Sequence, residues 1–173
     1  MHKWLKWMIL RYNKSILAMA TVLERELVNL QKIRMACLSH QTSIRVPQLL
    51  GYVRHSETGR IIGFLREWVP GDRLKNIDIS MTTARRRQSW ASQIRETVDK
   101  LHAIEVIWGD VKVSNVIVDT EDNAMLIDFG GGFTEGWVHK ELADTLEGDE
   151  QGIKNIMDFL GVKEEEAPSS GLM

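Results

Sequence analysis

The sequence predicts an α+β fold for this chain of 173 residues. Long segments carry apolar residues at intervals of three and four positions, which is typical of helices with one buried face. Two pairs of short apolar runs, each joined by a turn-forming segment, indicate antiparallel strand pairs. The composition, 43% hydrophobic and 27% charged, is that of an ordinary globular protein. The length suits one domain with a sizeable core rather than two full domains.

The first predicted helix covers about residues 18–38. Its apolar residues recur at helical spacing and are Met19, Leu23, Leu27, Leu30 and Cys37. Residues 46–53 and 60–69 are apolar runs with β-branched and aromatic members, separated by RHSETG. Because that separator is rich in turn-forming residues, the two runs predict an antiparallel strand pair.

A second helix is expected over about residues 82–103, with Ser80 as its N-cap. The runs VIVD and AMLID, joined by TEDN, predict a short hairpin over residues 116–128. A Gly-rich irregular segment follows to about residue 144, and a third helix is expected over residues 149–160. The acidic and Pro/Ser/Gly-containing composition of residues 163–173 predicts a disordered tail.

Charge and cysteine content exclude several classes of protein. The net charge of -2 gives no electrostatic footprint for nucleic acid. The single cysteine, Cys37, rules out an internal disulfide framework and favours a reducing, cytoplasmic compartment. No apolar run approaches the roughly 18 residues that a transmembrane helix needs. The first ten residues predict a packed strand or helix, with attachment to a membrane surface as the alternative.

Asp110, Asn115 and Asp128 fall on loops that flank the predicted hairpin. Aspartate and asparagine are common in turns, so each alone is compatible with a solvated loop. As a spaced set, they place hard oxygen ligands for Mg²⁺ at one edge of the hairpin. Asp110 lies near enough to face a substrate hydroxyl, and Lys112 could neutralise charge on a transferred phosphoryl group. The set therefore favours a metal-phosphate site.

The motifs GDVKVSN and DFG, at this separation, resemble those of the protein-kinase-like family. The resemblance implies that Asp110 is the catalytic base and that Asn115 and Asp128 hold Mg²⁺. The resemblance extends over about residues 18–160. Within the family, the sequence looks like the abbreviated kinase-like proteins of filamentous fungi, in which the tryptophan-glycine-aspartate loop and DFGGG occur together.

Further segments are similar to other parts of the family's nucleotide site. ELVNLQKI resembles the αC helix, in which Glu26 would face the lysine that anchors phosphate; Lys6 is the candidate for that lysine. GFLREWVPGDRL resembles the hinge, where the Glu67 carbonyl and the Val69 amide would pair with adenine. EGDEQG resembles the start of the helix whose aspartate, here Asp149, braces the catalytic loop.

The resemblance implies a protein-kinase-like fold with a reduced N-terminal lobe and a shortened, mostly helical C-terminal lobe. Residues 1–69 would form a partial N-lobe with an αC-like helix and a strand pair. Residues 70–162 would form the C-lobe with the catalytic loop and DFG, and residues 163–173 a disordered tail.

Two departures from the family's pattern bear on function. Trp108 and Gly109 replace the His-Arg that precedes the catalytic aspartate, so control by a phosphorylated activation loop is not expected. The first glycine is Gly51, so no Gly-rich phosphate loop precedes Glu26. The function implied is an ATP- and Mg²⁺-dependent phosphotransferase that resembles protein serine/threonine kinases and transfers the γ-phosphate to a hydroxyl acceptor. Relatives that phosphorylate small molecules share the geometry of the Asp and Asn. The alternative is a pseudokinase or scaffold module without catalysis.

Overall fold

The computed structural model describes residues 16–40 and 43–162. Its helices and strands mix along the chain, and the strands form two small antiparallel sheets, which confirms the predicted α+β fold. The elements are α1 (Ile16–His40), β1 (Leu49–Arg54), β2 (Ile61–Arg66), β3 (Gly71–Arg73), α2 (Ala84–Ala103), β4 (Val116–Asp119), β5 (Ala124–Leu126) and α3 (Leu146–Leu160). The expected tail at residues 163–173 and the first ten residues lie outside this range.

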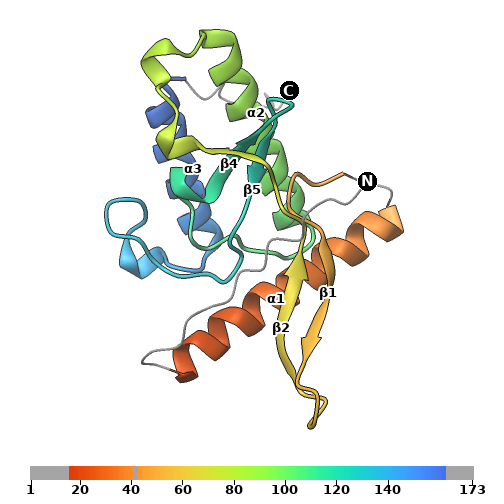
Figure 1. Cartoon of the computed structure of the whole chain (residues 1–173). Coiled ribbons are helices and arrows are strands. Elements are labelled where there is room, and N and C mark those ends of the chain that lie inside the picture. Colours follow the sequence, from red (N-terminus) through yellow and green to blue (C-terminus); the bar gives the residue numbers. More distant parts are fainter. Residues whose placement is uncertain (1–15, 41–42, 163–173) are drawn as a thin grey trace, which may run out of the picture.

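The helix α1 and the β1–β2 hairpin form one side of the molecule (Figure 1). The two strands pair antiparallel, as predicted, with irregular register near both ends. The first strand begins at Leu49 rather than at Val46, because the Val46 amide donates to the Ile44 carbonyl in a tight turn. Ile44 and Val46 are nevertheless buried. These apolar residues therefore belong to a loop that packs in the core, and the sequence pattern alone does not distinguish such a loop from a strand.

The helix α2 begins at Ala84, and its N-cap is Thr83 rather than the predicted Ser80. The Thr83 hydroxyl accepts a hydrogen bond from the Arg86 amide at 3.3 Å. Ser80 lies in a preceding 3-10 turn, where its amide and hydroxyl both donate to the Asp78 carboxylate. The prediction of Ser80 was wrong because two hydroxyl residues compete for the cap and tertiary packing sets where the helix starts.

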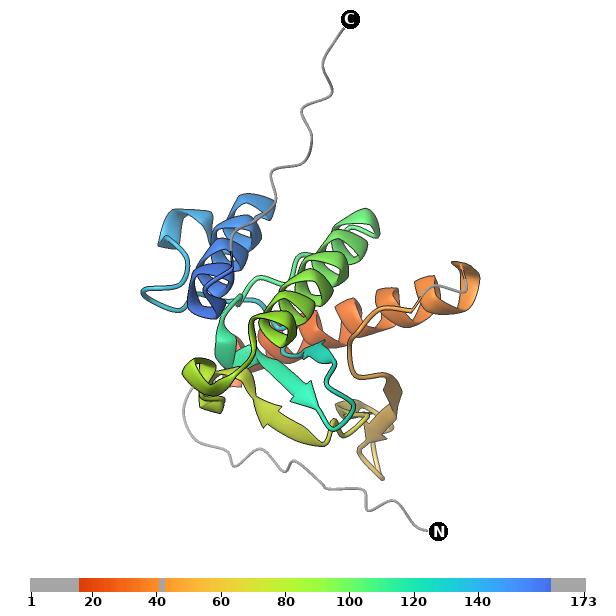
Figure 2. The ribbon, with the colours of Figure 1, turned by 90° about the horizontal axis from the view of Figure 1, so that it is seen from above.

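The second sheet has the strand order β3-β4-β5, and its neighbouring strands pair antiparallel. The β4–β5 hairpin was predicted, whereas β3 was not, because its three residues are all exposed and carry no apolar alternation. Figure 2 shows α2 and α3 side by side at one end, and α2 also packs against β5. A single apolar core joins these elements to α1; its largest fully buried side chains include Trp90, Trp108, Phe129, Leu30, Leu74 and Ile94.

The helix α3 starts at Leu146, three residues before the predicted position. Its N-cap is Thr145, whose hydroxyl accepts from the Gly148 amide at 3.0 Å. Nothing in the part of the chain described here has both the length and the apolar character of a membrane-crossing helix.

Candidate functional site

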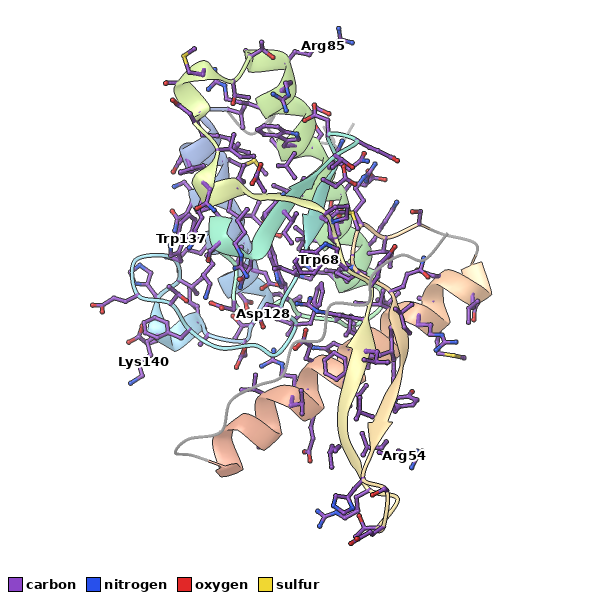
Figure 3. All side chains as sticks on the ribbon, in the orientation of Figure 1. Arg54, Trp68, Arg85, Asp128, Trp137 and Lys140 are labelled. Carbon is purple, nitrogen blue, oxygen red and sulfur yellow. The ribbon has the colours of Figure 1, made fainter. Side chains whose placement is uncertain are left out.

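The β4–β5 hairpin brings the predicted metal ligands to one edge of its sheet. Val116 pairs with Leu126 across the hairpin, and the Ile127 amide donates to the Asn115 carbonyl at 3.0 Å. Asn115 therefore lies beside the strand end that leads into Asp128. Figure 3 shows Asp128 near the centre of the molecule, above α1 in this view.

Asp110 is nearly buried, and its carboxylate is held by three side chains. The Thr134 hydroxyl donates to Oδ1 at 2.8 Å, and the Asn115 amide donates to Oδ2 at 3.1 Å. The Lys112 ammonium also donates to Oδ2. Lys112 reaches Thr134 Oγ1 at 2.9 Å as well, which closes a small network. Such a network fixes the orientation of the carboxylate.

Thr134 is a member of this network that the sequence reasoning missed. It comes six residues after Asp128, in the Gly-rich stretch GGGFTEG. The only signal in the sequence was a hydroxyl residue in that stretch, which is also a common turn composition.

Asn115 and Asp128 carry oxygen atoms of the kind that Mg²⁺ binds. Asn115 uses its amide nitrogen on Asp110, with bonds of 2.9 Å to the carbonyl and 3.1 Å to the carboxylate, and so directs its amide oxygen elsewhere. Asp128 has φ 68°, a left-handed conformation that is uncommon for a residue with a side chain. Such strain persists only where the surroundings impose it. Hard oxygen donors of this kind are the ligands that Mg²⁺ prefers.

The residue after Asp128 anchors this strained backbone. The Phe129 side chain is fully buried, and its carbonyl accepts a hydrogen bond from Asn29 Nδ2 of α1 at 2.9 Å. Because Asn29 is itself buried, this bond ties α1 directly to the DFG segment.

Asp149 lies under the catalytic loop and is fully buried. Its carboxylate accepts from the backbone amides of Trp108 and Gly109, both at 2.8 Å. His102 Nε2 of α2 lies 2.8 Å from the same carboxylate. These contacts agree with the bracing that the EGDEQG motif implies. Asp149 also lies in the first turn of α3, where the helix dipole favours a negative charge.

Trp108 provides a second support for the loop. Its indole is fully buried, and Nε1 donates to the Ile127 carbonyl at 2.9 Å. This bond joins the start of the catalytic loop to the residue before Asp128. Trp108 thus packs in the core and also makes a polar contact with the hairpin.

Glu26 extends from α1 toward the same region. In the part of the chain that the structure describes, its ion-pair partner is Arg66 at the end of β2, with Oε1 3.8 Å from Nη1. Burial raises the pKa of Glu26, the Arg66 guanidinium opposes that rise, and the negative charge of Asp128 adds to it. Lys6 lies outside the described residues, so its pairing with Glu26 stays a prediction.

The raised pKa of Glu26 predicts how the stability of the protein depends on pH. As pH rises from the ordinary value of 4.5 through the raised value, the folded state holds a proton that the unfolded state has lost. In that window, the free energy of unfolding falls as pH rises. Glutamine does not titrate, so the free energy of unfolding of a Glu26→Gln variant should fall less than that of the wild type as pH rises through the same window. Denaturant unfolding between about pH 4 and pH 8 measures the difference.

The matched control for this measurement is Glu24→Gln, which removes an exposed glutamate two residues away on α1. It should follow the wild-type pH profile. Parallel profiles for Glu26→Gln and wild type would contradict the assignment of a buried carboxyl at Glu26.

The hinge residues connect β2 to β3. The Glu67 amide donates to the Gln48 carbonyl at 2.9 Å, and its carboxylate accepts from the Gln48 amide at 3.4 Å. Val69 is buried, whereas Trp68 is 62% exposed. The Glu67 amide and carboxylate are thus engaged with the strand pair. The binding of adenine at Glu67 and Val69 stays a prediction.

Comparison with known proteins identifies the family. A family model described as a protein kinase domain matches residues 8–150, which is most of the chain. The chain therefore belongs to the protein kinase family, as its motifs predicted.

Individual relatives agree with this assignment. The dual specificity protein kinase zakA of Dictyostelium discoideum is 32% identical over 91 residues, which cover 50% of this chain and 12% of that protein. A probable serine/threonine-protein kinase, the KIN1 homolog of Encephalitozoon cuniculi, is 35% identical over 66 residues, or 37% of this chain and 12% of that protein. The chain thus spans only a small fraction of the length of these relatives.

Proposed function

We propose that this chain is an ATP- and Mg²⁺-dependent phosphotransferase that transfers the γ-phosphate to a hydroxyl acceptor. The observation that carries the proposal is the network in which Lys112, Thr134 and Asn115 hold the Asp110 carboxylate, with Asn115 bonded through its carbonyl to the residue before Asp128. Phosphoryl transfer requires positioning and charge stabilisation more than covalent participation by the protein. A fixed carboxylate, a cation and two oxygen ligands at one edge of a hairpin supply both.

In this proposal, Asp110 orients the acceptor hydroxyl and accepts its proton. The acceptor oxygen forms a bond to the γ-phosphorus as the bond from that phosphorus to the bridging oxygen breaks, and ADP leaves. Lys112 lies beside Asp110 and would neutralise charge on the transferred group. Asn115 and Asp128 would hold Mg²⁺, which when bound neutralises charge on the phosphates.

The nucleotide would lie between the two parts of the chain, 1–69 and 70–162. Its adenine would meet the hinge at Glu67 and Val69, and its phosphates would approach Glu26 and the proposed anchoring lysine, Lys6. The KIN1 homolog is a probable serine/threonine-protein kinase, which favours a protein hydroxyl as the acceptor over a small molecule. The single cysteine favours a cytoplasmic location.

Nucleotide binding tests the proposal before any acceptor is known. We expect ATP with Mg²⁺ to raise the Tm of the wild type by several degrees, since ligand at 100 times its Kd adds about 2.7 kcal/mol to the stability of the folded state. Asp128→Asn should lose most of the Mg²⁺-dependent part of this shift, because an amide is a weaker ligand than a carboxylate. A thermal-shift titration with and without a chelator measures both.

Asp99→Asn is the matched control for Asp128→Asn, because Asp99 is exposed on α2. It should keep the wild-type shift. A wild-type Tm that ATP and Mg²⁺ do not change would count against the phosphotransferase and would favour a pseudokinase or scaffold module.

A further inference from the structure

An ion pair connects α1 to the segment that follows the DFG motif. Arg25 Nη1 lies 2.6 Å from Asp144 Oδ1, and the two side chains are 31% and 40% exposed. The same carboxylate oxygen accepts from the Gly132 amide at 3.0 Å. Asp144 has φ 61°, an uncommon conformation for a residue with a side chain. The backbone is thus held in a strained form at the residue that meets Arg25.

Two glycines make room for this pair. A Cβ atom at Gly131 would overlap the Arg25 guanidinium and would lie 2.6 Å from Asp144 Oδ1. A Cβ atom at Gly109 would lie 2.7 Å from the same oxygen and 3.1 Å from Arg25 Nη2. Both glycines have positive φ, 74° and 87°, which other residues rarely adopt. The Arg25–Asp144 pair therefore occupies a space that side chains at these positions would fill.

Gly109 stands directly before Asp110, at the position where the kinase motif has an arginine. In kinases that are switched by phosphorylation, new pairs between arginine and phosphate order the activation loop. Here the arginine comes from α1, and the negative charge is the carboxylate of Asp144. The Arg25–Asp144 pair thus joins an arginine to an anion, as the arginine–phosphate pair does in a phosphorylated kinase, but its anion is a carboxylate.

We infer that Arg25 and Asp144 are positioning residues that hold residues 128–145 against α1 in the absence of phosphorylation. This inference rests on the proposed function, since it concerns the regulation of that site. The pair adds to the bond between Asn29 and the Phe129 carbonyl, one turn further along α1. A loop closed by a carboxylate leaves the site assembled at all times, and no kinase is needed to switch it on.

Hydrogen exchange of the full chain tests, without reference to catalysis, whether the Arg25–Asp144 pair holds residues 128–145. A half-exposed ion pair contributes little to global stability, so the effect should be local. We expect Arg25→Gln and Asp144→Asn each to increase the exchange rate of residues 128–145 several-fold, with α2 and α3 unchanged. The double variant should exchange no faster than either single variant, because the two side chains act as one unit.

Arg45→Gln is the matched control, because Arg45 forms a similar pair with Glu96 at 2.7 Å, with exposures of 30% and 48%. It should leave residues 128–145 unchanged. Additive effects in the double variant, or no change of exchange in either single variant, would overturn the inference. These outcomes do not depend on whether the protein transfers phosphate.

Kinetics supply a second readout. We expect Arg25→Gln to lower kcat about tenfold to a hundredfold, as small misplacements of a reacting group do, with little change in the KM for ATP. Arg25→Lys retains the charge and should recover part of the loss. Treatment of the wild type with a nonspecific phosphatase should leave its turnover unchanged. Loss of turnover after phosphatase treatment would show that a phosphate, and not Asp144, holds the segment.

Discussion

Replacing Asp110 by asparagine is expected to reduce phosphate transfer from ATP by about a hundredfold to ten-thousandfold, the range that removal of a general base produces. The amide has the shape of the carboxylate but cannot accept the proton of the acceptor hydroxyl. It also places an NH₂ group where one carboxylate oxygen accepts a hydrogen bond, either Oδ2, to which Lys112 and Asn115 donate, or Oδ1, to which Thr134 donates. The loss should appear mainly in kcat, because the nucleotide contacts lie elsewhere.

The measurement is the rate of ADP formation with a panel of Ser/Thr peptides and small hydroxyl compounds. Asp99→Asn, an isosteric change on the exposed face of α2, is the control and should retain the wild-type rate. The Tm of Asp110→Asn should be compared with that of the wild type, so that loss of folding is recognised. Equal rates for Asp110→Asn and wild type would exclude Asp110 as the base.

The placement of the candidate site could be predicted because it depends on local rules. A short hairpin has a fixed register, so the residues before its first strand and after its second lie at one edge of the sheet. Asn115 and Asp128 occupy these positions. The spacing of Asp110 and Lys112 within one loop is equally local. Helical periodicity similarly predicted α1, in which Leu30 of the expected apolar face is buried.

The remaining features depend on the path of the backbone in three dimensions. Thr134 reaches Asp110 only because the Gly-rich segment turns back over the loop. The Arg25–Asp144 pair joins residues more than a hundred positions apart. The strand β3 has no apolar pattern, since its pairing with β4 uses backbone groups of exposed residues. No rule of spacing or periodicity relates such partners in the sequence.

Asp149→Ala is expected to cause a large loss of stability, although Asp149 has no proposed role in the reaction. The fully buried carboxylate accepts from the amides of Trp108 and Gly109, and His102 Nε2 lies within hydrogen-bonding distance of it. Without it, two backbone N–H groups lose their partner under the catalytic loop, at about 1–3 kcal/mol for each unsatisfied donor. We expect a total of about 3–5 kcal/mol. In a chain of this size, that lowers the Tm by about 2–4 °C per kcal/mol.

Denaturant unfolding at neutral pH measures this loss, with Asp158→Ala as the control on the exposed side of the same helix. The control should stay within about 0.5 kcal/mol of the wild type. If Asp149→Ala does not fold, Asp149→Asn provides the measurement, because it keeps one acceptor oxygen and the volume of the side chain. Asparagine should lose less stability than alanine but should still lower phosphate transfer, since Trp108 and Gly109 determine where Asp110 lies. A stability of either Asp149 variant equal to that of Asp158→Ala would show that the catalytic loop does not depend on this brace.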